Sequence, residues 1–198
     1  NNCKVVLSNE ESQGGKCDRC GGEVVQKEKE VWMLKITDYA EKLLEGLNHV
    51  DFPERVRLQQ ENWIGKSTGA ILKFKVKELE DVEIPVYTTR ADTVYGVTYL
   101  VVAPEYKDIE KLTTPENMEA VKQYRENAKK MTEIERLSTD RVKTGVPLGT
   151  HIINPFTGRV CPIWVADYAL VDYGTGAVMA VPYHDERDFA FAKKYNLP

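Results

Sequence analysis

The stretch that decides the fold runs from Gly176 to Asn196 and reads GAVMAVPYHDERDFAFAKKYN. Its first residues are small or apolar, which is typical of a buried strand, and Pro182 ends that run. From Asp185 to Tyr195, apolar side chains recur at helical spacing behind an acidic start. The stretch therefore predicts a strand, a short polar loop and a helix in direct succession.

The rest of the chain contains further strands and helices. Between Gly69 and Val76, apolar residues alternate with lysines, which predicts a half-buried strand. Other strands are predicted over 82–89, 98–103, 144–153, 159–166 and 176–181. Helices are predicted over 37–46, 53–62, 114–131 and 185–195, with Thr37, Pro53 and Thr114-Pro115 as start signals. Short strands interrupted by helices predict an α+β fold with a barrel-like, mostly antiparallel β core and surrounding helices, rather than regular βαβ winding.

Composition and charge limit the kinds of protein that this chain can be. Its 198 residues, 42% hydrophobic and 29% charged, fit one globular domain with a small appendage. No apolar run approaches the ~18 residues of a membrane span, and the polar start lacks a signal peptide, so we expect a cytoplasmic protein. The net charge of −4 argues against a domain that grips nucleic acid through its phosphates. It allows a domain that takes only the end of a nucleic acid held elsewhere.

The cysteines suggest a metal or thiol use rather than a disulfide framework. Cys17-Asp18-Arg19-Cys20, followed by Gly21-Gly22, is half of a zinc knuckle, and Cys3 offers a third thiol. A structural zinc takes four ligands and no fourth lies nearby, while Cys161 is expected to be a buried apolar residue. We expect residues 1–30, with strand-like pieces at 5–7 and 23–25, to be a partial zinc-ribbon-like segment and residues 31–198 to form the second domain. The missing Met and the abrupt end suggest a segment of a larger protein, so zinc binding stays open.

A phosphate-binding loop is suggested by Gly65-Lys66-Ser67-Thr68 but does not fit its context. Such a loop needs a glycine five positions before the second glycine, and position 60 is Gln. The segment also precedes a strand instead of opening a helix after one. It is expected to be a turn.

The densest polar cluster is Thr88-Thr89-Arg90-Ala91-Asp92-Thr93, at the end of an apolar strand. Asp92-Thr93 fits a plain helix cap. The same residues fit the wall of a polar pocket, in which threonine hydroxyls and backbone N–H groups hold a carbonyl or hydroxyl and Arg90 meets a phosphate or carboxylate. The residues alone leave both interpretations open.

Asp185 and Asp188 admit two interpretations as well. An N-cap Asp followed three residues later by a second acidic residue stabilises a helix start without any ligand. The preceding Gly174-Thr175-Gly176 and the small residues after it would also let a ligand approach the backbone closely, and a carboxylate at that rim would suit an ammonium. His184 alone is weak evidence of catalysis.

Several stretches together resemble one known family. They read NWIGKSTG (62–69), TTRADTVYGVTY (88–99) and DYGTGAVMAVPYHDERD (172–188), and WMLKITDYAEKLL (32–44) fits the same segment. In this order they are similar to the editing domain of bacterial leucyl-tRNA synthetases, the connective-polypeptide insertion of these class I aminoacyl-tRNA synthetases. TTRADT and KITDYAEKLL favour the leucyl type over the isoleucyl and valyl types.

The resemblance implies hydrolytic proofreading. A synthetic site discriminates poorly between amino acids that differ by a methyl group, because a methylene contributes only ~1–3 kcal/mol. The family's second pocket hydrolyses the ester of norvaline, isoleucine and similar residues on tRNA(Leu) and spares leucyl-tRNA(Leu). The implied partners are the 3′ end of mischarged tRNA(Leu) and the remainder of the synthetase, and editing needs no cofactor. The competing interpretation is a non-catalytic module that docks tRNA or another protein.

The resemblance also assigns roles to residues of this sequence. Asp188 corresponds to the aspartate that binds the α-ammonium, and Thr93 to the threonine that excludes leucine by steric clash. Thr88 and Thr89 correspond to threonines around the scissile ester and the attacking water, so with Asp188 they form the expected catalytic set. The other expected substrate-binding residues are Arg90, Tyr173, Met179, Val181 and Asp185.

The sequence departs from the family pattern in places. Ala91 stands where the motif often has Pro, Tyr95 where it often has Met, and Tyr183 where a Gly is common before the His-Asp pair. None of these changes removes a polar role, although Tyr183 alters the rim of the expected pocket. With no Ser-His-Asp or Cys-His set in view, we expect direct attack by a water that threonine hydroxyls and backbone N–H groups orient.

Overall fold

The computed structural model describes residues 3–8, 10–25, 30–131, 135, 136, 138, 141–171 and 174–198. The chain divides into two compact units, one of Lys27–Thr68 and one of Asn1–Gln26 together with Gly69–Pro198. The division into domains 1–30 and 31–198 stays a prediction. No helix in the described part is long and apolar enough to cross a membrane.

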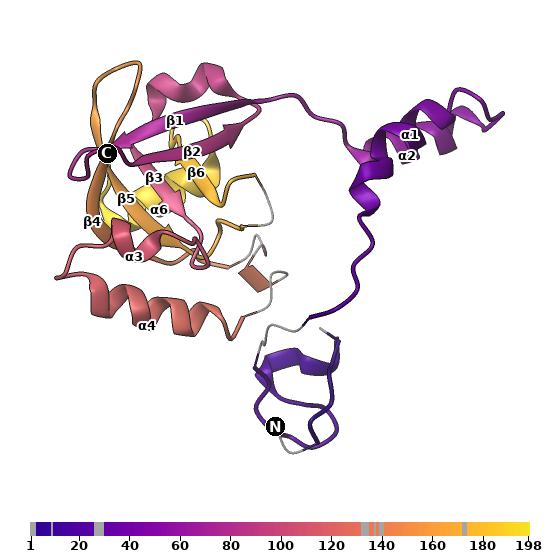
Figure 1. Cartoon of the computed structure of the whole chain (residues 1–198), viewed down its shortest axis with the longest axis horizontal. Coiled ribbons are helices and arrows are strands. Elements are labelled where there is room, and N and C mark those ends of the chain that lie inside the picture. Colours follow the sequence, from indigo (N-terminus) through magenta and orange to yellow (C-terminus); the bar gives the residue numbers. More distant parts are fainter. Residues whose placement is uncertain are drawn as a thin grey trace. The chain divides into compact units, whose positions relative to one another are not determined.

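A single mixed sheet organises the larger unit (Figure 1). Its strands follow the order β2-β1-β4-β5-β3-β6, and all neighbours pair antiparallel except β3 and β5, which are parallel. Their bounds are β1 Ala70–Val76, β2 Glu83–Thr88, β3 Tyr99–Val102, β4 Gly145–Ile153, β5 Val160–Ala166 and β6 Ala177–Ala180. The predicted α+β fold with a mostly antiparallel β core is confirmed, and each predicted strand of residues 69–181 is found within two residues of its expected bounds.

The two edge strands, β2 and β6, lie against each other without pairing, so the sheet curls but stays open. The loop that leads into β6 also approaches β2, since a Cβ added at Gly174 would lie 3.4 Å from the Cβ of Tyr87. The curl therefore brings the end of β2, where Thr88 lies, close to the loop that leads into β6.

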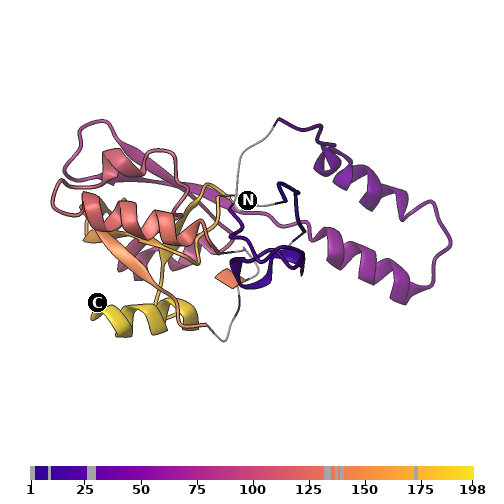
Figure 2. The same ribbon diagram turned by 90° about the horizontal axis from the view of Figure 1, so that it is seen from below.

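Helices cover both faces of the sheet, and each face has its own core. One face packs against α3 (Ile109–Leu112) and α4 (Met118–Ala128), and the other against α6 (Glu186–Tyr195), which lies on the opposite side of the strands in Figure 2. The alternation along β3 explains this arrangement, because Leu100 and Val102 join the first core while Tyr99 and Val101 join the second. The central strands are thus apolar on both sides.

Some helix starts differ from the predicted ones. Thr114 was expected to cap a helix over 114–131, but α4 begins after Asn117, whose side chain donates to the Thr114 hydroxyl at 3.0 Å. Thr37 lies inside a 3₁₀ turn, Ile36–Tyr39, instead of capping the following helix. The short helix α3 was not predicted, since four residues carry too little periodicity. In residues 3–8 and 10–25 the expected strand pieces reduce to one isolated bridge, Lys16 to Glu23.

The smaller unit consists of two helices and an extended lead-in. Its helices are α1 (Ala40–Gly46) and α2 (Glu54–Ile64), and Pro53 precedes α2 as the sequence predicts. Gly65 ends α2 in the left-handed conformation, with φ of 63°, so the Gly65–Thr68 segment starts as a helix terminus and not as a phosphate-binding loop. Many apolar side chains of this unit are exposed, Trp32 and Trp63 above all.

Candidate functional site

The start of α6 holds a buried carboxylate, that of Asp188. Asp185 caps the helix, because its Oδ1 accepts a hydrogen bond from the Asp188 amide at 3.0 Å. Asp188 in turn accepts a hydrogen bond from the Val181 amide at Oδ2, also at 3.0 Å. The residue is only 1% exposed, and its Oδ1 is buried with no hydrogen-bond partner in the described part of the chain. One oxygen is therefore fixed by the backbone, while the other has no hydrogen bond within the described residues.

The electrostatics of Asp188 are set mainly by its burial. Burial raises the pKa of Asp188 to about 6, and the negative charge of Asp185 acts in the same direction, while the Val181 amide and Arg187 oppose the shift. The carboxyl group is still mostly charged at neutral pH. A buried, charged oxygen without a hydrogen bond is costly, and a bound cation or ammonium would relieve that cost.

Arg187 is a weak neighbour of this carboxylate. Its Nε lies 3.8 Å from Oδ1 of Asp188 and its Nη2 lies 3.6 Å from Oδ2 of Asp185. Both distances exceed that of a good charge-assisted hydrogen bond, and the Arg187 side chain is 39% exposed. Oδ1 of Asp188 is therefore not engaged in a strong ion pair with Arg187.

The second polar cluster follows β2 and forms a tight turn. The half-buried Thr88 accepts a hydrogen bond from the Arg90 amide at 3.0 Å, and the buried Thr93 donates its hydroxyl hydrogen to the Arg90 carbonyl at 2.9 Å. Arg90 and Asp92 pair with each other at 3.0 Å, and both are largely exposed. The 3₁₀ helix Ala91–Gly96 has no side-chain cap, so the interpretation of Asp92-Thr93 as a plain helix cap is wrong.

Two loops of the expected site lie side by side. A Cβ added at Gly96 would lie 3.8 Å from the His184 ring, and His184 also contributes to lowering the pKa of Asp92, after the larger effect of Arg90. Met179 pairs with Leu100 across β3 and β6, and Met179 and Val181 belong to the same apolar core as Val94, the residue after Thr93. The Thr88–Thr93 turn and the β6–α6 connection are thus joined through β3.

The expected site residues are only partly connected by direct contacts. Asp185, Asp188 and Val181 contact one another, and Thr88, Arg90 and Thr93 form the other group. No hydrogen bond joins Thr88 or Thr89 to Asp188 within the described residues, and Thr89 is exposed. Tyr173 lies outside the described residues. The functional roles of these side chains stay predictions.

Sequence reasoning missed two tyrosines behind Asp188. The Tyr99 hydroxyl donates to the backbone carbonyl of Asp188 at 2.9 Å, and its oxygen lies 3.3 Å from the Tyr168 hydroxyl. Tyr99 ends the TTRADTVYGVTY stretch, so a polar tip in a buried strand was the available signal. Nothing in the sequence places Tyr168 beside it.

Three cysteines form the remaining candidate site, which suits a metal. The thiol sulfurs of Cys3, Cys17 and Cys20 lie within 4.8 Å of one another. The pKa of Cys20 is lowered to about 7, chiefly by a hydrogen bond from the Gly22 backbone, which favours the thiolate that binds zinc. Three sulfur donors fit a zinc site in kind, and among the described residues no fourth Cys, His or carboxylate joins them. Cys161 is buried in β5, as expected.

Comparison with known proteins identifies the family. A family model described as leucyl-tRNA synthetase, editing domain, matches residues 61–198. Leucine–tRNA ligases of Clostridium botulinum and Clostridium kluyveri are 55% and 53% identical over 196 residues, which is 99% of this chain and 24% of each relative. The chain thus spans about a quarter of the length of the curated relatives that it matches.

A solved structure agrees with this match. It is described as the ternary complex of an Agrobacterium radiobacter LeuRS with tRNA and LeuAMS. The likeness has a TM-score of 0.74 at 36% sequence identity and covers 98% of this chain and 23% of the other. Since the family model also covers well over half of the residues, the chain belongs to the family of leucyl-tRNA synthetase editing domains.

Proposed function

We propose that this chain hydrolyses the ester of mischarged tRNA(Leu), carrying norvaline, isoleucine or a similar residue, and spares leucyl-tRNA(Leu). The observation that carries the proposal is the buried Asp188, whose Oδ1 has no hydrogen-bond partner in the described part of the chain. Such an oxygen suits the α-ammonium of an aminoacyl ester, and it lies in a motif of the family to which the chain belongs.

In the proposed mechanism each cluster has one task. Asp188 anchors the ammonium, and the buried Thr93 narrows the side-chain pocket so that leucine clashes. Thr88 and Thr89 orient the water that attacks the ester carbon, and the turn's N–H groups stabilise the developing oxyanion. The water oxygen bonds to the ester carbon, the bond from that carbon to the ribose oxygen breaks, and a proton of the water passes to the ribose oxygen. Free amino acid and tRNA are released without a covalent intermediate on the chain.

The proposed partners are the 3′ end of tRNA(Leu) and the rest of a leucyl-tRNA synthetase, acting in the cytoplasm. The net charge of −4 fits a chain that binds only the 3′ end, since the remainder of the enzyme would hold the tRNA body. We further propose that Cys3, Cys17 and Cys20 contribute to a structural zinc site that editing does not use.

The test is hydrolysis of isoleucyl-tRNA(Leu) and norvalyl-tRNA(Leu), with leucyl-tRNA(Leu) as the control. Wild type should cleave only the wrong esters. Asp188→Ala should lose on the order of a hundredfold in kcat/KM, because a buried charge pair is lost. Thr93→Ala should begin to cleave leucyl-tRNA(Leu).

The competing function, a non-catalytic docking module, makes the opposite prediction. A docking module would bind tRNA or a protein partner with no dependence on Asp188 or Thr93. If the folded chain cleaves nothing, the same variants in the full-length synthetase decide between the two. Unchanged editing by full-length Asp188→Ala would refute the ammonium-anchor role.

A further inference from the structure

Two buried tyrosines lie directly behind Asp188. Tyr99, in β3, is 0% exposed, and Tyr168, which follows β5, is 3% exposed. The Tyr99 hydroxyl donates to the Asp188 carbonyl at 2.9 Å, and the two phenol oxygens are 3.3 Å apart. Because the single Tyr99 hydrogen is engaged, Tyr168 must be the donor in the bond between them. Burial raises the pKa of both phenols, so both stay protonated.

These hydroxyls are not needed to fill the core. Both rings pack in an apolar cluster around Phe191, and two phenylalanines would occupy nearly the same space without bringing polar atoms into it. A buried hydroxyl is retained at low cost only where it finds a partner. Here the partners lead from one tyrosine to the other and then to the first turn of α6.

Tyr168 also lies against the charged neighbour of Asp188. The guanidinium carbon of Arg187 lies 4.7 Å from the Tyr168 ring centroid, in a cation–π contact. The same guanidinium reaches to 3.8 Å from Oδ1 of Asp188. The Tyr168 ring therefore helps to position the Arg187 guanidinium beside Oδ1 of Asp188.

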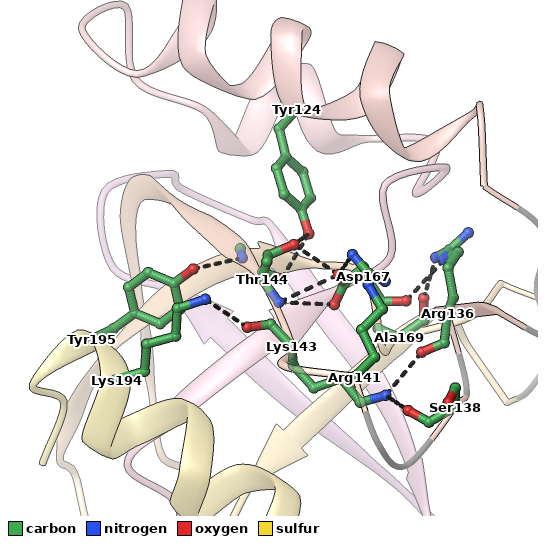
Figure 3. A network of polar contacts seen from close by, with 11 residues as sticks. Tyr124, Arg136, Ser138, Arg141, Lys143, Thr144, Asp167, Ala169, Lys194 and Tyr195 are labelled. Atoms are coloured by element: carbon green, nitrogen blue, oxygen red, sulfur yellow. Dashed lines mark hydrogen bonds and ion pairs between the residues drawn. The ribbon is translucent and has the colours of Figure 1, made fainter. Parts of the chain in front are cut away.

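The backbone on either side of Tyr168 is fixed by a buried arginine (Figure 3). Arg136, 4% exposed, donates from Nε to the Asp167 carbonyl and from Nη2 to the Ala169 carbonyl, both at 2.8 Å. The Asp167 carboxylate accepts from the Thr144 hydroxyl at 2.7 Å and pairs with Arg141 at 2.9 Å. Tyr168 is thus held between two anchored residues, which leaves its ring little freedom.

We propose that Tyr168 is a positioning residue for editing: through Tyr99 and Arg187 it holds Asp188 where the ammonium of the substrate binds, and Arg136 with Asp167 fixes Tyr168 in turn. The inference rests on the proposed function for the role of Asp188. It adds residues that do not touch the substrate but determine how well the anchor works.

Tyr168 should also affect the protonation of Asp188. The charged and titratable groups that face Asp188 are Asp185 and Arg187 from its own segment, Tyr99 from β3 and Tyr168 from the segment after β5, besides the Val181 amide. The Tyr168 hydroxyl also faces the carboxylate and lowers the pKa of Asp188, which is the smallest of these contributions, since its hydrogen is shared with the Tyr99 oxygen and no bond of good geometry reaches Oδ1. The Tyr168→Phe change removes one of the contributions that lower the pKa of Asp188, so that pKa should rise further.

The experiment compares Tyr168→Phe with wild type in the full-length synthetase. We expect KM for isoleucyl-tRNA(Leu) to rise about threefold to tenfold with kcat nearly unchanged, the effect of losing one buried hydrogen bond. The acid limb of the pH profile of kcat/KM should move to higher pH. Carboxyl carbon NMR of this chain should show the same upward movement of the Asp188 pKa without any substrate.

Tyr195→Phe is the matched control. Tyr195 packs on Phe191 in the same cluster, but its hydroxyl accepts a hydrogen bond from the Gly145 amide instead of serving Asp188. Its loss should lower stability without changing KM or the pH profile. If Tyr168→Phe does not fold, Tyr99→Phe carries the same test, because it removes the bond to the Asp188 carbonyl.

The outcomes separate this inference from the proposed function. If wild type edits and depends on Asp188, while Tyr168→Phe keeps the wild-type KM and pH profile, the positioning role is refuted. It is refuted as well if Tyr195→Phe produces equal changes, since the effect would then be general loosening of the core. If wild type does not edit at all, the proposed function fails, and the NMR titration alone still decides whether Tyr168 controls Asp188.

Discussion

At the scale of single residues, Asp188 is both buried and mostly charged, two properties that rarely occur together. Its carboxylate is buried, and one oxygen has no hydrogen bond in the described part of the chain, which destabilises the fold. The group remains mostly charged at neutral pH, which suits an ammonium. Such a conflict between local stability and charge is typical of a functional site. A helix cap alone explains Asp185 but not why Asp188 is buried.

This conflict predicts how stability depends on pH. The folded-state pKa of Asp188, about 6, lies above its ordinary 3.8, so the folded protein binds the proton more tightly than the unfolded chain. The stability that the fold gains from protonated Asp188 is fully present below pH 3.8 and is lost as pH rises through about 6. At about 1.4 kcal/mol per pH unit, the free energy of unfolding of wild type, relative to Asp188→Asn, should fall by on the order of 3 kcal/mol between those values. Urea unfolding at a series of pH values measures it, and a difference that rises with pH would contradict the assignment.

At the scale of elements, the succession of β6, loop and α6 matters most. The apolar run up to Val181 forms the strand, and the backbone turns so that the Val181 amide meets the Asp188 side chain at 3.0 Å. The Asp185 cap then fixes the first helical turn on which Asp188 stands. Local signals in the sequence predicted all three elements, because strand period, proline and cap act over a few residues.

The cap predicts a graded result at Asp185. Asp185→Ala removes the acceptor for the Asp188 amide and should cost about 1 kcal/mol of stability. Asp185→Asn keeps an acceptor there and should cost only a few tenths of that, so it serves as the matched control. Thermal and urea unfolding of both variants measure the difference. Equal losses would mean that the charge of Asp185, and not its hydrogen bond, stabilises the helix start.

The hairpin of β1 and β2 predicts a second effect on the site. A Cβ at Gly69 would lie 2.5 Å from the Thr88 carbonyl oxygen and 2.6 Å from the Tyr87 ring, so the backbone that presents Thr88 would have to move. Gly69→Ala should cost about 1–3 kcal/mol of stability and slow the hydrolysis of isoleucyl-tRNA(Leu). Gly46→Ala, where an added Cβ meets nothing within 4 Å, is the control. Wild-type stability and activity of Gly69→Ala would show that the close approach of β1 to Thr88 is not needed.

At the scale of the whole molecule, the sequence predicted single helices and strands better than the contacts between them. The strand β1 was predictable because its lysines alternate with buried Phe74 and Val76. The Tyr99–Tyr168 bond joins residues 69 positions apart, and no local pattern encodes which strands become neighbours. The same reason explains Arg136, whose partners lie on either side of Tyr168 and depend on the order of the sheet. The resemblance supplied the residues that are expected to touch a ligand, whereas the tyrosines and the arginine packed behind Asp188 emerged only from the fold.

The cysteines allow a last prediction, which separates the proposed metal site from the proposed editing site. The thiols of Cys3, Cys17 and Cys20 cluster within 4.8 Å, while Cys161 is 0% exposed. Zinc should therefore protect three thiols from alkylation, Cys161 should stay unreactive with or without metal, and Cys20→Ser should abolish zinc uptake. Cys161→Ser is the control and should bind zinc as wild type does. None of the three cysteines is among the contacts that the described residues make with Asp188, so chelation should leave the proposed hydrolysis of isoleucyl-tRNA(Leu) intact. Alkylation of the three thiols at the same rate with and without zinc would refute the metal site, and loss of hydrolysis on chelation would show that editing depends on it.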